Sequence, residues 1–122
     1  NNRGVAKLGL NQSDEAILDF LQAIKCDPFC ASTYNNLGYA QLILKRYDAA
    51  IINLTKAIKI NPNYEEAYLN RGNTHFVLKN YNDAINDYSQ TIQCNPNSVF
   101  AYTNRAKAHL ALNNLRRALM DY

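Results

Sequence analysis

Apolar residues recur along the chain at intervals of three and four, which is the spacing of an amphipathic helix. The segment that ends near Cys26 is typical, with Ile17, Phe20, Leu21 and Ile24 on one face. Several segments stop at an Asp-Pro or Asn-Pro pair, because the residue before a proline disfavours helical backbone angles. The pattern predicts an all-α protein with helices near residues 1–8, 14–26, 31–44, 47–60, 65–78, 81–94, 99–112 and 115–122.

The predicted helices form pairs that repeat along the chain. Within residues 65–96, a set of residues finds the same residue type 34 positions earlier: Tyr68, Gly72, Leu78, Tyr81, Ala84, Ile85, Ile92 and Pro96. A fixed period of this length indicates an array of small units, each of which packs mainly on its neighbours. We therefore interpret residues 1–122 as one array with a partial first repeat (1–30), a second (31–64), a third (65–98) and a truncated fourth (99–122).

The repeated unit resembles the tetratricopeptide repeat (TPR), whose 34-residue pattern of aromatic, glycine, alanine and proline positions is filled in register along the whole chain. The matching residues are Gly4, Ala16, Phe20, Ala23 and Pro28, then Tyr34, Leu37, Gly38, Ala50, Leu54 and Ala57, then Tyr68, Gly72, Ala84, Tyr88 and Pro96, and finally Tyr102, Ala106, Ala118 and Tyr122. Arg71 and Thr91 depart from the pattern. The resemblance implies an α-solenoid, a right-handed superhelical array of antiparallel helix pairs.

Small residues recur where the two helices of a pair are expected to cross. Gly38 and Gly72 lie on the first helix of their repeats, and Ala50 and Ala84 lie on the second. Close approach of the two backbones there offsets the roughly 1 kcal/mol that a glycine costs inside a helix. Most of the nine tyrosines fall in repeated slots around this crossing, so we expect them to be core residues.

The function implied by the resemblance is protein binding. TPR arrays are non-catalytic scaffolds for protein–protein interaction, and they bind an extended peptide or a partner helix in a concave groove. An alternative within the family is the substrate-recognition arm of a larger enzyme, such as an O-linked N-acetylglucosamine transferase. A catalytic domain beside the repeats would distinguish the second reading from the first.

The groove positions of the family give the candidate site. The sixth position of every repeat is an asparagine: Asn2, Asn36, Asn70 and Asn104. An asparagine side chain offers one acceptor and two donors, so this ladder could bond the backbone of a peptide of any sequence. Alternatively, the asparagines bond only within the array. Other groove positions vary between repeats and are candidates for setting specificity: Asn35, Tyr39, Asn73 and Lys107.

One known binding mode of the family is argued against. The carboxylate clamp for chaperone tails spans three successive repeats. It needs cationic side chains at set positions on the first helix of the first and of the third of these repeats. Starting from the first repeat, the sequence offers Asn1, Val5, Asn36, Glu66 and Asn70; starting from the second, it offers Asn35, Tyr39, Asn70, Phe100 and Asn104. No cationic pair is present in either frame, so we expect no carboxylate-clamp chaperone tail as partner.

Charge and composition exclude several further classes. The net charge of +3 is scattered, and Lys45, Arg46 and Lys79 fall near turns, so we expect no nucleic-acid partner. No apolar run approaches the ~20 residues that span a membrane. No phosphate-binding loop or nucleophile–base pair is present, so we expect neither an enzyme nor a cofactor.

Cysteine and histidine are too few for a metal site. Cys26 and Cys94 share a repeat slot with Ile60, which predicts buried, reduced thiols. Cys30 lies in a loop, and His75 and His109 are the only histidines, so we expect no metal.

The ends of the chain carry two further expectations. The chain has no initiating methionine and starts and stops within a repeat, so we interpret it as a fragment. Its localisation is therefore open, with the cytoplasm slightly favoured. We also expect self-association of the fragment through its truncated ends, where apolar faces lack their neighbours.

Overall fold

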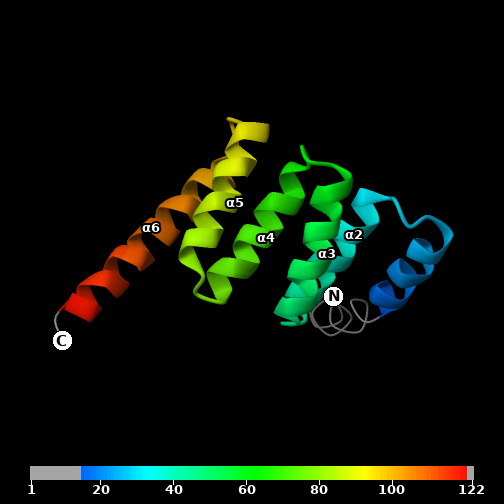
Figure 1. Ribbon diagram of the computed structural model, residues 1–122, viewed down its shortest axis with the longest axis horizontal. Coiled ribbons are helices and arrows are strands. Elements are labelled where there is room, and N and C mark those ends of the chain that lie inside the picture. The colour runs from blue at the N-terminus through cyan, green and yellow to red at the C-terminus, as the bar shows by residue number, and fades with distance from the viewer. Residues whose placement is uncertain (1–14, 121–122) are drawn as a thin grey trace, which may run out of the picture. The chain divides into compact units, whose positions relative to one another are not determined.

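The computed structural model describes residues 15–120, and no strand occurs among them. A helix over residues 15–26 is followed by five more: α2 (Ala31–Ile43), α3 (Tyr47–Ile60), α4 (Glu65–Val77), α5 (Tyr81–Cys94) and α6 (Val99–Met120) (Figure 1). The all-α prediction is confirmed. Asn2 and the expected helix over residues 1–8 lie outside the described residues.

The described part of the chain forms two compact units, which divide between Pro62 and Asn63. In the first unit, α2 packs against α3, and a core forms around Ile17, Leu37 and Ala40. Gly38 makes the crossing possible, since a Cβ atom there would lie 2.6 Å from Leu54 Cγ. Such a distance is far inside van der Waals contact, so the predicted role of this glycine is confirmed.

The second unit repeats this packing with a third helix added. The helix α5 contacts both α4 and α6 (Figure 1). A Cβ atom on Gly72 would lie 2.8 Å from Tyr88 Cε1, and the Tyr88 side chain is only 1% exposed. Ala84, Tyr88 and Ala108 join α5 and α6 in one apolar cluster. The expectation of core tyrosines is therefore right for Tyr88 and, at 8% exposure, for Tyr34, whereas Tyr47, Tyr68 and Tyr81 are only half-buried and Tyr102 is 45% exposed.

The turns inside the second and third repeats have the same hydrogen-bonded form. After α2, Lys45 has a left-handed φ of 63°, its N–H donates to the Leu42 carbonyl (3.0 Å), and the Arg46 N–H donates to the Gln41 carbonyl (2.8 Å). This is a Schellman motif, with a lysine where glycine is usual. Lys79 repeats it after α4 with a φ of 64°.

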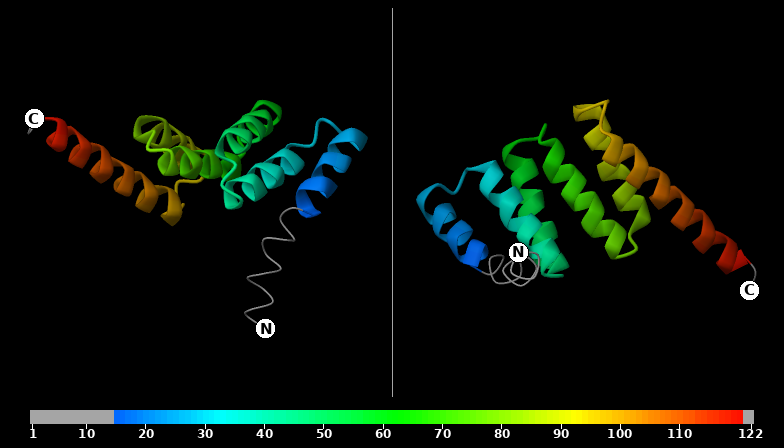
Figure 2. Two further views of the ribbon diagram at one scale, coloured as in Figure 1. Left: turned by 90° about the horizontal axis from the view of Figure 1, so that it is seen from below. Right: turned by 180° about the vertical axis from the view of Figure 1, so that it is seen from behind.

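The predicted turn in the fourth repeat is wrong. The repeat pattern predicts a helix that ends near Leu112 and another that begins at Leu115, whereas α6 runs unbroken from Val99 to Met120 (Figure 2). A left-handed residue costs about 1 kcal/mol or more, and in the earlier repeats a following 14-residue helix compensates for it by packing back. Residues 115–120 do not pack back on α6 as a second helix but continue it, so no left-handed residue is needed there.

The expectation of buried thiols is also wrong. Cys26 and Cys94 are both exposed. Their repeat slot lies in the last turn of the second helix, and Ile60 in the same slot is 37% exposed. The exchange of isoleucine for cysteine therefore reflects tolerance at a helix end rather than core packing.

Candidate functional site

The predicted groove residues of the second repeat all lie on α2. Asn36 is exposed and Tyr39 is 50% exposed, so both side chains are available to a ligand. Asn35 is different, because it is only 2% exposed. Its side chain belongs to the packed interior and can support its neighbours more readily than it can touch a peptide.

Three predicted residues of the third and fourth repeats come together at one pocket within the second unit. The pocket has a volume of about 210 Å³ and is open to solvent. Its lining comes from α4, α5 and α6: Asn73, Phe76, Val77, Tyr88, Asn104 and Lys107. Apolar side chains and the Tyr88 ring form most of the lining, while the two asparagines and the lysine supply polar groups.

Hydrogen bonds fix how the two asparagines present themselves. The Tyr88 hydroxyl donates to Asn73 Oδ1 at 2.7 Å, and Asn104 Nδ2 donates to the same oxygen at 3.1 Å. An amide oxygen has two lone pairs, so this acceptor is fully used. What remains for a ligand is the amino group of Asn73 and the carbonyl oxygen of Asn104, together with the second N–H of Asn104.

The Tyr88 hydroxyl, which donates to Asn73, stays protonated. Burial, followed by the nearby charge of Asp87, raises the pKa of the Tyr88 phenol well above its ordinary value. The phenol therefore keeps its proton at any physiological pH. In the structure this hydroxyl donates to Asn73 Oδ1, which leaves the amide nitrogen of Asn73 for a ligand.

The asparagines of the ladder are not all fully exposed to solvent. Asn36 is exposed, and Asn70 and Asn104 are half-buried. The bond from Asn104 to Asn73 is a contact within the array, which is the alternative that sequence analysis left open. The free donors and acceptors of Asn104 still allow a ligand contact, so the ladder stays a prediction.

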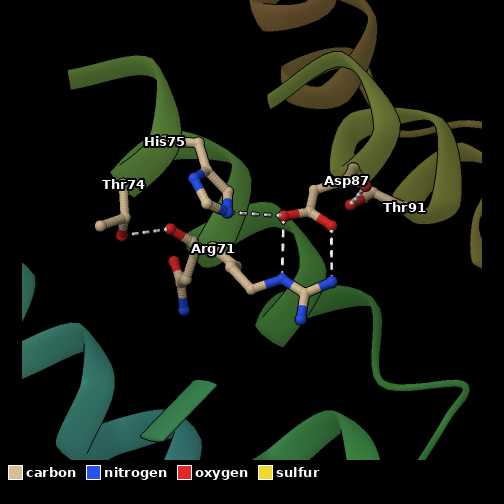
Figure 3. A network of polar contacts seen from close by, with 6 residues as sticks. Arg71, Thr74, His75, Asp87 and Thr91 are labelled. Atoms are coloured by element: carbon tan, nitrogen blue, oxygen red, sulfur yellow. Dashed lines mark hydrogen bonds and ion pairs between the residues drawn. The ribbon is translucent and has the colours of Figure 1, made fainter. Parts of the chain in front are cut away.

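A polar network that sequence analysis did not anticipate lies between α4 and α5 (Figure 3). Arg71 Nε donates to Asp87 Oδ2 at 2.9 Å and Arg71 Nη2 donates to Asp87 Oδ1 at 2.8 Å, which makes a bidentate ion pair. His75 Nε2 lies 3.9 Å from Asp87 Oδ2, and its buried Nδ1 has no hydrogen-bond partner in the described chain. The bond to Asp87 raises the pKa of Arg71.

The equivalent positions of the second repeat are occupied by uncharged residues. Leu37, Gln41 and Asn53 stand where the third repeat has Arg71, His75 and Asp87. Leu37 is 1% exposed and Asn53 Nδ2 donates to Gln41 Oε1 at 2.8 Å. The departure of Arg71 from the family pattern is therefore matched by an acidic partner on the facing helix. The departure at Thr91 is matched too, since its hydroxyl donates to the Asp87 carbonyl at 3.0 Å.

Other chemistry is sparse in the part of the chain that the structure describes. Residues 15–120 contain no cluster of three histidine, cysteine or acidic side chains able to hold a metal ion. None of the described helices has the length and apolar character to cross a membrane. Cys30, at the N-cap of α2, stands out among the thiols, because hydrogen bonds from Ser32 and Thr33 lower its pKa from 9.0 to about 7.

Family comparison agrees with the repeats seen in the fold. Three models described as tetratricopeptide repeats match the chain, the first at residues 31–64 and 65–98, the second at 88–120 and the third at 1–30. The fold and the site thus define an all-α repeat protein of the protein-binding class. The chain belongs to the tetratricopeptide repeat family. A search of curated proteins finds no match.

Solved structures of the same family are similar to the chain. The first TPR of Spaghetti (RPAP3), bound to the HSP90 peptide SRMEEVD, is 27% identical with a TM-score of 0.83, over 92% of this chain and 89% of that one. The first TPR domain of human RPAP3 is 26% identical with a TM-score of 0.85, over 95% and 91%. The Arabidopsis OM64 TPR domain is 27% identical with a TM-score of 0.80, over 88% and 89%.

Proposed function

We propose that this chain is a non-catalytic interaction module that binds an extended segment of a partner protein. The observation that carries the proposal is the pocket of the second unit. Residues chosen from sequence as groove positions, Asn73, Asn104 and Lys107, line it beside Phe76 and Tyr88. An apolar hollow with a few placed polar groups is typical of a recognition site.

The asparagine ladder supplies sequence-independent contacts in this proposal. Asn2, Asn36, Asn70 and Asn104 bond the peptide backbone, each through an amide that can donate and accept. Tyr39, Asn73 and Lys107 choose among side chains, since they differ between repeats. Asn35, which is buried, keeps the exposed face of α2 in place.

A chaperone-tail clamp is not part of this proposal. The similar first TPR of Spaghetti carries an HSP90 peptide, so this chain must be compared with it directly. The two frames that cover three repeats here place no cationic pair at the clamp positions, and only the central asparagine, Asn36 or Asn70, matches. A terminal carboxylate therefore lacks its charge partners, and we expect internal peptide segments to bind instead.

The test is selection from a random peptide library displayed on phage, with the chain immobilised. We expect saturable enrichment of a family of related peptides. Replacing Asn36, Asn70 and Asn104 together by Ala should weaken binding of the enriched peptides, by about 0.5–1.5 kcal/mol for each lost backbone bond. The helical circular dichroism spectrum of the triple variant should stay unchanged, since none of these asparagines is fully buried. Absence of any enrichment contradicts the proposed function.

A further inference from the structure

The pocket of the second unit has the size of a single side chain. Its volume of about 210 Å³ falls below the roughly 300–1,000 Å³ of pockets that enclose whole small molecules. Phe76 packs edge-on against Tyr81, with ring centroids 5.5 Å apart, and Tyr88 is held by the apolar cluster. The apolar walls are therefore fixed in place and ready to receive an aliphatic or aromatic group.

The rim of the pocket has a fixed hydrogen-bonding polarity. Because Asn73 Oδ1 already accepts from Tyr88 and Asn104, the amino group of Asn73 is the part that faces a ligand as a donor. Asn104 keeps its own carbonyl oxygen as an acceptor. A donor and an acceptor on these two amides, which are bonded to each other side by side at the rim, match the C=O and N–H groups of an extended peptide whose side chain enters the pocket.

The pocket also carries one uncompensated charge. Lys107 is exposed, and within residues 15–120 it makes no hydrogen bond or ion pair. Two other cations of the second unit are engaged, since Arg71 pairs with Asp87 and Arg105 Nη1 donates to Ser89 Oγ at 3.2 Å. None of the described residues that line the pocket carries a carboxylate. An incoming carboxylate therefore finds a single ammonium group, at the edge of an apolar hollow.

From these three features we infer that the pocket recognises an apolar side chain followed or preceded by an acidic one, within an internal segment of a peptide. This inference rests on the proposed function and names the side chains that it selects. The apolar residue fills the space between Phe76, Val77 and Tyr88. Asn73 and Asn104, side by side at the rim, bond the backbone next to it, and Lys107 pairs with the neighbouring carboxylate.

The test uses synthetic peptides blocked at both ends, so that no terminal carboxylate can contribute. Four peptides differ only at their centre, which is Leu-Glu, Leu-Gln, Leu-Lys or Ala-Glu, and binding is followed by fluorescence anisotropy. We expect Leu-Glu to bind most tightly. Ala-Glu should bind at least about tenfold more weakly than Leu-Glu, because the buried leucine side chain is replaced by a methyl group. Leu-Lys should bind about fivefold or more weakly than Leu-Glu, because its charge has the wrong sign.

Charge reversal in the protein provides the sharper arm of the test. Lys107→Glu should invert the preference, so that Leu-Lys binds more tightly than Leu-Glu. A merely structural role of Lys107 would weaken both peptides alike. The matched control is Lys45→Glu, an exposed lysine in the turn after α2 that does not line the pocket, and it should leave the preference for Leu-Glu intact.

The outcomes separate this inference from the proposed function. Equal binding of Leu-Glu and Leu-Lys, equal binding of Leu-Glu and Ala-Glu, or an unchanged order in Lys107→Glu overturns the inference. If the random library still yields related peptides in any of these cases, the proposed function stands and only the assignment of the pocket falls. If the library yields none and all four peptides fail to bind, both fall.

Discussion

Arg71 and Asp87 show how one residue changes what its repeat requires elsewhere. Asp87 is only 4% exposed, and a buried carboxylate without a partner is strongly destabilising. Arg71 donates two hydrogen bonds to this carboxylate. At the equivalent positions, the preceding repeat has the apolar Leu37 and the neutral amide of Asn53. The two repeats therefore hold the same helix crossing by different chemistry.

The first prediction replaces the ion pair of the third repeat by the uncharged residues of the second. Arg71→Leu should lower the free energy of unfolding by about 3 kcal/mol at neutral pH, because it leaves the Asp87 carboxylate buried and unpaired. Adding Asp87→Asn and His75→Gln, which copies the second repeat, should bring the stability back to within about 1 kcal/mol of the original chain. Urea denaturation followed by circular dichroism measures both. Equal stability of the single and triple variants would show that the ion pair is not what the crossing depends on.

The second prediction concerns the glycine at that crossing. Gly72→Leu should destabilise the chain by about 1–3 kcal/mol or more, and even Gly72→Ala should destabilise it, although alanine favours helices by roughly 1 kcal/mol. The reason is the Tyr88 ring, 2.8 Å from the added Cβ atom. The measurement is the melting temperature.

The control for Gly72 is the same slot in the fourth repeat, where Ala106 is exposed on α6. Ala106→Gly changes helix propensity alone and should cost about 1 kcal/mol. A melting temperature that rises in Gly72→Ala would mean that the crossing has room to spare, against the packing described above.

The packing role of the small repeated residues was predicted from the sequence, whereas the ion pair of Arg71 with Asp87 was missed. The packing role of Gly38, Gly72 and Ala84 was predictable, because a small residue that recurs at a fixed period indicates a close approach of two helices. The pair of Arg71 with Asp87 was not anticipated, although the same two residue types recur at these repeat slots as Arg3 with Asp19 and as Arg105 with Asp121. An arginine in a leucine slot was the available signal, and a search for an acid on the facing helix would have found its partner.

At the scale of elements, the start of α2 is chemically unusual. Cys30 is its N-cap residue, with Sγ 3.3 Å from Ser32 Oγ, and no side-chain bond caps the helix. Hydrogen bonds from Ser32 and Thr33 stabilise the thiolate, so the pKa of Cys30 is lowered to about 7. A thiolate is the reactive form of cysteine.

The third prediction is the pH dependence of that reactivity. A lowered pKa means that the thiolate persists down to lower pH, so alkylation of Cys30 by iodoacetamide should reach half its maximal rate near pH 7. Cys26→Ser and Cys94→Ser, both at exposed positions, leave Cys30 as the sole thiol for the measurement. Ser32→Ala should move the midpoint upward toward 9.0, since it removes the largest cause of the shift. A midpoint that stays near 9 in the parent chain would contradict this account of the helix start.

The elements themselves were largely predictable, with one instructive exception. The ranges expected for residues 47–60 and 81–94 are those of α3 and α5, because a proline stop and a polar turn frame each of them. The continuity of α6 was not predictable from Asn113 and Asn114, which suit a turn as well as a helix. Whether a turn forms there depends on a packing partner for the next helix, which is a tertiary effect.

For the whole molecule, the apolar surface of α6 leads to the fourth prediction. Val99, Phe100 and Leu110 are 72%, 73% and 65% exposed, and exposed apolar surface of this kind favours association. We expect the chain to self-associate at high concentration, through these side chains. Sedimentation across a concentration series measures it, with Phe100→Ser together with Leu110→Ser as the variant that should remain monomeric. A constant monomer mass for the parent chain would exclude the prediction.

The central claim is that the asparagine amides of the repeats, with the pocket beside Asn104, receive a peptide. The most direct measurement is a nitrogen–proton NMR correlation spectrum of the side-chain amides, recorded while a library-selected peptide is added. The account predicts saturable shifts for the side-chain amides of Asn36, Asn70, Asn73 and Asn104. Binding that leaves these signals unmoved, and shifts the amides of Asn53 and Asn86 on α3 and α5 instead, would contradict it.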